Sequence, residues 1–119
     1  MQQLQIPPLA EGETYIGAIG DQQGNLHHII LLPKDNDDAN WTDQMAWAES
    51  LGADLPTRVE LGLIWDRARD QLQKEWYWTN EVHHADSSYA WYQSFVNGYQ
   101  FTNHKSAELR AVAVRRLPI

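Results

Sequence analysis

The residues with the clearest capacity for chemistry are the aromatic side chains around Asn97-Gly98, in the segment YAWYQSFVNGYQFTNHK (89–105). Asn-Gly is a preferred central pair of the type I′ turn, so this segment predicts a two-stranded hairpin. Pairing across a two-residue turn places Val96 opposite Tyr99. The chemistry available to such a hairpin is stacking of aromatic rings on a ligand, aided by amide hydrogen bonds.

Both faces of the predicted hairpin carry aromatic rings, because neighbouring residues of a strand point to opposite sides. A small sheet commonly buries only one face. If the face with Tyr92 and Tyr99 stays accessible, its rings beside Asn97 suit stacking on sugars or docking on a protein. The alternative is that a helix or the segment 75–82 covers this face, which would make its rings part of the core.

A second group with chemical capacity is the acidic run at Asp35, Asp37 and Asp38, in a predicted polar loop. Carboxylates packed this closely could bind calcium, which prefers oxygen ligands. The spacing does not fit an EF-hand, because Ala39 and Ala46 stand where that motif needs oxygen ligands. We therefore favour a solvated acidic loop before a helix N-terminus over a metal site.

Histidines occur in two adjacent pairs, His27-His28 and His83-His84. The first pair lies in a predicted strand, where neighbours point to opposite faces and cannot chelate one ion together. The second pair shares a loop with Asp86 and could bind a transition metal, but its spacing does not provide a closed zinc ligand set.

The same loop supplies the only serine–histidine combination that we weighed as catalytic. Ser87 and Ser88 lie close in sequence to His83 and His84. No nucleophile-elbow pattern surrounds them, and catalysis needs a nucleophile, a base and an orienting group that meet in space. We find no such set in the sequence and expect no enzyme activity.

Composition and charge restrict the class of partner. The chain has 119 residues, of which 43% are hydrophobic and 21% charged, which is typical of one globular domain. Its net charge of -7 argues against a nucleic-acid-binding face and against an anionic membrane surface, which both require clustered positive charge. There are no cysteines, which excludes disulfides and thiolate chemistry.

The N-terminal residues MQQLQIPPLAEGE have no basic region and no long apolar run. We therefore expect no signal peptide and no membrane insertion, and a cytoplasmic or virion-associated location. We interpret residues 1–13 as an irregular arm and residues 14–119 as a single domain.

The elements that must position these residues follow from local patterns. Asn40 is a good N-cap for one helix, and Thr57 with Glu60 forms a capping box that begins another. Apolar residues follow each start at helical spacing. The expected elements are strands at 14–20 and 26–33, helices at 41–51 and 58–73, a strand at 75–82, the hairpin at 89–105 and a strand at 109–117.

These landmarks in this order resemble a known family. The segments HHIILLP, AWAESLGADLPTRVEL, YWTNE, YAWYQSF with the following NG, and LRAVAVRR are similar to the domain-of-unknown-function 1566 family, also called the Lcl carboxy-terminal domain. That family occurs in many bacterial and prophage proteins. The resemblance covers roughly residues 13–117. It implies an α+β, C-type-lectin-like fold, in which two helices flank a small antiparallel sheet and the N- and C-terminal strands pair.

The resemblance also implies roles for particular residues. It implies that Trp91 and Phe95 belong to the core, which leaves Tyr92 and Tyr99 exposed or partly exposed. Three residues match positions that carry a positive charge in the family, namely Arg110, Arg115 and Lys105. We expect them to pair with acidic groups or to cover aromatic faces. The related formylglycine-generating enzymes depend on cysteines, so their chemistry is excluded in a chain without them.

Two functions of different classes follow as hypotheses. The first is a non-catalytic module that recognises a glycan or cell-surface polymer, as a component of phage or prophage attachment to the host. The alternative is a small prophage-encoded intracellular module that binds a host protein and inhibits or modulates it.

The predicted ligand-binding residues are Tyr92, Tyr99, Asn97, Trp76, His83 and His84. No cofactor is expected, and calcium at Asp35, Asp37 and Asp38 is the ion that the sequence leaves as a weaker alternative. Both a homo-oligomer and a larger phage assembly are compatible with the sequence.

Overall fold

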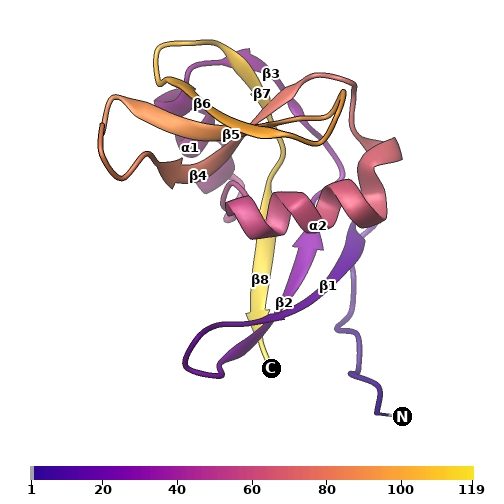
Figure 1. The fold of residues 1–119 in the computed structure, drawn as a ribbon. Coiled ribbons are helices and arrows are strands. Elements are labelled where there is room, and N and C mark those ends of the chain that lie inside the picture. Colours follow the sequence, from indigo (N-terminus) through magenta and orange to yellow (C-terminus); the bar gives the residue numbers. More distant parts are fainter. Residues whose placement is uncertain (1) are drawn as a thin grey trace.

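Two sheets and two helices make up the part of the chain that the computed structural model describes, residues 2–119 (Figure 1). Residues 2–13, predicted as an irregular arm, contain no helix or strand, and the first residue of that arm lies outside the described residues. The elements are β1 (Thr14–Gly20), β2 (Leu26–Leu31), β3 (Asn36–Ala39), α1 (Trp41–Ser50), α2 (Arg58–Ala68), the 3-10 helix η1 (Arg69–Gln71), β4 (Trp76–Val82), β5 (Tyr89–Ser94), β6 (Gln100–His104), β7 (Leu109–Ala111) and β8 (Val114–Pro118).

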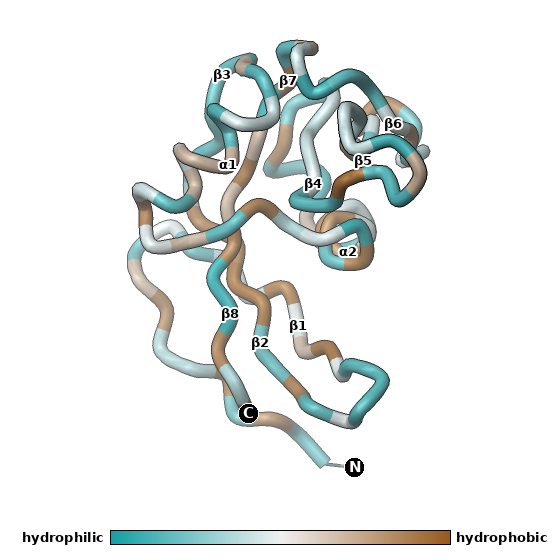
Figure 2. Tube along the Cα trace, turned by 90° about the vertical axis from the view of Figure 1, so that its left-hand side faces the viewer, coloured by the Kyte–Doolittle hydropathy of each residue, from teal (hydrophilic) through white to brown (hydrophobic). Residues whose placement is uncertain are grey.

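The α+β class is confirmed, but the arrangement of the strands differs from the prediction of one small antiparallel sheet. One sheet is three-stranded, with the order β1-β2-β8, and the other is five-stranded, with the order β3-β7-β4-β5-β6. The larger sheet is mixed, since β4 and β7 pair in parallel at Tyr77 and Arg110. In the side view of Figure 2 the three-stranded sheet lies below the larger sheet and the helices.

The predicted direct pairing of the first and last strands is wrong. β2 lies between β1 and β8 and pairs antiparallel with both. A short turn joins β1 to β2 and favours their pairing, which leaves the other edge of β2 for β8. The segment predicted as one strand over 109–117 is two strands, because Val112 and Ala113 carry the chain from the larger sheet to the smaller one (Figure 1).

The helix starts are confirmed. The Asn40 side chain accepts the backbone N–H of Asp43 at 2.8 Å. At α2 the capping box is complete, with Thr57 Oγ1 accepting the Glu60 N–H and Glu60 accepting the Thr57 N–H. The second helix was predicted to run to residue 73. The α-helix ends at Ala68, and the next residues form the 3-10 helix η1.

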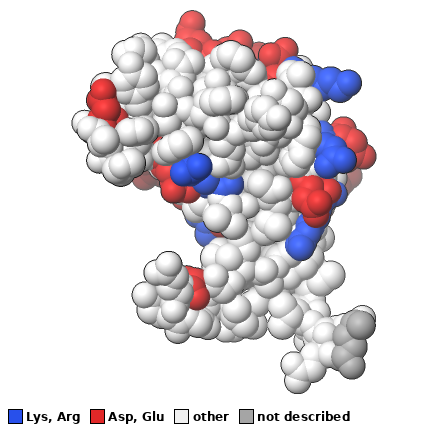
Figure 3. All heavy atoms as spheres, in the orientation of Figure 1, with Lys and Arg blue, Asp and Glu red and all other residues white. Residues whose placement is uncertain are grey.

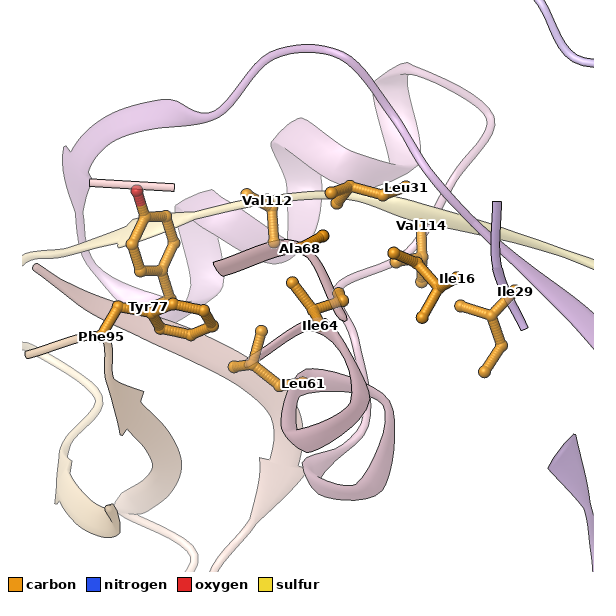
Figure 4. Packing of buried hydrophobic residues seen from close by; sticks show 10 residues of the cluster. All are labelled: Ile16, Ile29, Leu31, Leu61, Ile64, Ala68, Tyr77, Phe95, Val112 and Val114. Carbon is orange, nitrogen blue, oxygen red and sulfur yellow. The ribbon is translucent and has the colours of Figure 1, made fainter. Parts of the chain in front are cut away.

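Two hydrophobic clusters hold these elements together. One joins the smaller sheet to α2 and the larger sheet, and its buried side chains point toward one another in Figure 4. Leu61 and Ile64 of α2 and Phe95 belong to it, so the prediction of Phe95 as core is confirmed. The second cluster packs α1 and the segment after it against Trp78 and Tyr92.

An ion-pair network joins the start of α2 to the smaller sheet. The Arg116 guanidinium donates to both oxygens of Glu60 at 2.7 Å and to Asp54 at 2.8 Å. His27 lies 3.3 Å from the same Glu60 carboxylate, whose side chain is 2% exposed. Burial by itself would raise the pKa of Glu60, but the hydrogen bonds and charge of Arg116 and the Thr57 N–H outweigh it and lower that pKa.

We expect the free energy of unfolding to fall as the pH is lowered below about 5. The pKa of Glu60 is lowered in the folded chain, so its contribution is present above the unfolded-state pKa and is lost as the pH falls through the folded-state value. Urea unfolding at pH values from 7 to 3 measures this. The variant Glu60→Gln should give a flatter profile, and an identical slope in both proteins would contradict the role given to Glu60.

Candidate functional site

The hairpin of β5 and β6 has a longer turn than predicted. Gln93 pairs with Gln100 and Tyr92 with Phe101, so Val96 and Tyr99 do not pair across a two-residue turn. Phe95 explains the longer turn. Strand β5 ends at Ser94, and the Phe95 ring packs in the core instead of continuing the hairpin. Each residue of β5 pairs with a residue of β6 two positions away from the predicted partner. Because side chains alternate between faces with a period of two, the residues predicted to share a face of the hairpin still share it.

The predicted exposure of Tyr92 is wrong, since only 7% of this residue is accessible. Its ring lies under the Trp76 indole, with centroids 4.9 Å apart and planes 25° apart, and meets the edge of Trp78. Burial raises the pKa of the Tyr92 phenol. Tyr92 is therefore a buried support, because two large neighbouring rings cover it.

Three other aromatic rings on this side of the sheet are exposed. Trp76 is 44% accessible, Tyr99 63% and Phe101 47%. Phe101 lies 6.1 Å from Tyr92 and 6.2 Å from Tyr99 between ring centroids, so the rings form one continuous cluster. We call these four residues, Trp76, Tyr92, Tyr99 and Phe101, the aromatic surface. Asn97 is exposed in the adjoining turn.

The predicted histidines lie on the other side of the hairpin. His83 is parallel to the ring of Trp91, with centroids 6.0 Å apart, and His84 stacks on His83. Trp91 is half-buried, not a core residue as the family resemblance implied, and the Arg58 guanidinium lies 3.5 Å from the centroid of its ring. The structure therefore divides the predicted site, because Trp91 and Tyr92 point to opposite faces of β5.

A pocket of about 220 Å³ lies on the histidine side, lined by His83, Asp86, Tyr89 and Thr102. We call it the histidine pocket. Nδ1 of His83 accepts the backbone N–H groups of Ala85 and Asp86, so Nε2 carries the proton in the neutral ring. Hydrogen bonds from Ser88 lower the pKa of Asp86. The Ser88 hydroxyl thus donates to a carboxylate.

The acidic run 35–38 lies partly in strand β3, where the sequence predicted a loop. Arg110 donates to Asp35 at 3.0 Å and to Asp37 at 3.1 Å, and Tyr77 also donates to Asp35. Burial is the largest effect that raises the pKa of Tyr77, to about 12. Two of the three carboxylates weighed for calcium therefore face a guanidinium, and residues 2–119 contain no group of three or more potential metal ligands.

The other predicted cationic contacts are confirmed as well. Arg115 binds the Glu13 carboxylate at 2.8 Å, and this hydrogen bond lowers the pKa of Glu13. The Lys105 ammonium lies 4.5 Å from the centroid of the Trp41 ring.

Asp38, the third carboxylate, lies in a different environment. It lines a pocket of about 340 Å³ together with Glu75, Trp76, Glu108 and Leu109. We call this the acidic pocket, and it adjoins the aromatic surface through Trp76. Sequence reasoning missed Glu75 and Glu108, because they lie far apart in the chain and no local motif joins them to Asp38.

Comparisons with known proteins do not assign the chain to a family: no family model matches it, and no curated protein matches it. Among residues 2–119, no helix has the length and apolar character needed to cross a membrane.

Proposed function

We propose that this chain is a non-catalytic binding module that docks a protein partner on its aromatic surface. The observation that carries the proposal is the exposure of Trp76, Tyr99 and Phe101 as one cluster on a buried support. Aromatic side chains are enriched at protein interfaces and supply large contact area with little loss of conformational entropy. Figure 3 shows that the region over β5 and β6 is largely free of charged side chains.

The tilts of the rings favour a protein over a polysaccharide as the ligand of this surface. The planes of Tyr99 and Phe101 are 67° apart, and those of Tyr92 and Phe101 are 41° apart. A polysaccharide that stacks on several rings needs them to face the same way, whereas an irregular protein surface can interdigitate with tilted rings. A protein ligand agrees with the hypothesis of a small module that binds a host protein and inhibits or modulates it.

A second candidate function is recognition of a glycan at the histidine pocket. The observation that favours it is the lining, which combines the polar groups of His83, Asp86 and Thr102 with the half-buried ring of Trp91 nearby. Such a mixture provides hydrogen bonds for sugar hydroxyls and an apolar face for a sugar ring. The family resemblance of the sequence favours this candidate too, and its role would be attachment of a phage or prophage component to a host cell.

The C-type-lectin-like assignment is part of this proposal. Three features support it: two helices accompany the sheets, β1 and β8 belong to the same sheet, and the candidate binding residues lie on the hairpin of β5 and β6 or on the strand and loop just before it. The domain-of-unknown-function 1566 family, which the sequence resembles, is proposed on the same grounds.

Alanine at Tyr99 and Phe101 is expected to abolish binding of peptides selected from a displayed random library on the wild-type protein, because these rings supply the contact area. The free energy of unfolding should change by less than about 1 kcal/mol, since both residues are exposed. Binding by fluorescence polarisation and urea unfolding measure the two effects. Tyr92→Ala is the matched control for a buried ring and should destabilise the chain by about 3 kcal/mol.

A glycan array, probed with the variant that lacks Tyr99 and Phe101 and with two variants of the histidine pocket, separates the two candidate functions. A glycan signal that survives the loss of Tyr99 and Phe101 but disappears in Thr102→Val and His83→Ala would favour the histidine pocket. A library that yields only peptides indifferent to Tyr99 and Phe101 would overturn the protein-docking proposal.

A further inference from the structure

The acidic pocket contains carboxylates that the chain leaves without a cation. Asp38, Glu75 and Glu108 are exposed, and within residues 2–119 none of the three has an ion-pair partner or a side-chain hydrogen bond. In contrast, Arg110, Arg115 and Arg116 are each paired with other carboxylates. Acidic side chains also gather along the upper rim of the view in Figure 3.

Trp76 provides this pocket with an aromatic wall. Tyr92 covers one face of the indole at 4.9 Å, and the residue is nevertheless 44% exposed, so the opposite face is the one that a ligand can reach. A cation over an indole face is attracted by the negative charge of the ring face. The indole of Trp76 and the three carboxylates therefore both favour a cationic ligand group.

A guanidinium group matches this combination better than an ammonium group. It is planar, stacks on aromatic rings and donates several hydrogen bonds to carboxylates at once. The chain itself places a guanidinium over an indole twice, with Arg58 at 3.5 Å from the centroid of Trp91 and Arg69 at 4.9 Å from that of Trp65.

We infer that the protein partner carries a basic segment that places an arginine side chain in the acidic pocket against Trp76, while its apolar side chains contact Tyr99 and Phe101. This inference rests on the proposed protein-docking function and names the chemistry of the partner. A second copy of this chain is a poorer occupant, because its net charge of -7 would oppose the association.

The test uses the peptide acetyl-Gly-Arg-Gly-amide and its citrulline counterpart, which has a similar shape and no charge. Titration of the ¹⁵N-labelled protein followed by NMR should shift the indole N–H of Trp76, assigned with the variant Trp76→Phe. The citrulline peptide should bind about tenfold more weakly, since charge-assisted hydrogen bonds and the cation–π contact are both lost.

Charge variants show whether the pocket, and not the overall charge, is responsible. Glu75→Gln combined with Glu108→Gln should weaken binding of the arginine peptide about tenfold at low salt. The matched control is Glu49→Gln combined with Asp66→Asn, which changes the net charge equally at exposed positions elsewhere and should leave the affinity unchanged. Equal weakening in both double variants would overturn the inference, as would equal affinity for the citrulline peptide.

Failure of this inference can be told apart from failure of the proposed function. Library peptides that require Tyr99 and Phe101 but contain no arginine would overturn the arginine anchor and leave the docking function intact. No selected peptide, together with no shift at Trp76, would overturn both.

Discussion

Replacement of Glu60 by alanine is expected to lower the free energy of unfolding by about 3 kcal/mol. The variant leaves Arg116 without the carboxylate that binds two of its nitrogens at 2.7 Å. It also removes one half of the capping box at Thr57. The expected loss is at the lower end for buried ion pairs, because Arg116 is 27% exposed and keeps Asp54.

Urea unfolding or calorimetry measures this effect, which corresponds to a fall in Tm of about 10 °C. The matched control is Asp66→Ala, whose carboxylate forms a longer, exposed contact of 3.8 Å with Arg67. That variant should change stability by less than about 0.5 kcal/mol. If both variants had equal effects, the network at Arg116 would not be a main connection between α2 and the smaller sheet.

Alanine at Gly98 is expected to destabilise the chain by about 3 kcal/mol and to weaken ligand binding at the aromatic surface. Gly98 has a φ of +82°, which side chains rarely adopt, and an added Cβ would lie 2.6 Å from the Trp65 ring. The turn must then move, and with it the neighbouring Tyr99. Unfolding and peptide binding, measured on the same preparation, report the two effects.

Gly24→Ala separates the two contributions to this loss. Gly24 has a similar φ of +86°, but an added Cβ there meets nothing within 4 Å. Its replacement should cost only the backbone strain, about 1 kcal/mol, and should not affect binding. A cost at Gly98 no greater than the cost at Gly24 would show that the Trp65 ring yields easily.

The elements that sequence reasoning predicted well are those that depend on residues close in the chain. The N-cap at Asn40 and the capping box of Thr57 and Glu60 satisfy backbone groups within the same helical turn, so their residue types are sufficient to place the helix starts. The expected engagement of Arg110 with acidic groups was confirmed, but which carboxylates it binds depends on β3 lying beside β7.

The candidate site was predicted only in part for the same reason. Tyr99 and Trp76 are exposed as expected, but Tyr92 is covered by two tryptophans from β4. The turn at Asn97-Gly98 follows Phe95, whose burial outweighs the local preference for a two-residue turn. His83 was grouped with the aromatic residues by its place in the sequence. Its ring instead stacks on Trp91, which the alternation of β5 puts on the side opposite Tyr92.

The sequence by itself determined the helix starts, the α+β class and the aromatic character of the hairpin, because capping and periodicity act over a few residues. Only the tertiary structure decided which rings are accessible, that β2 separates the first and last strands, and that Asp38, Glu75 and Glu108 meet beside Trp76. The physical reason is that accessibility and charge clustering depend on which distant segments pack together, and that choice is made by the whole core and not by any local pattern.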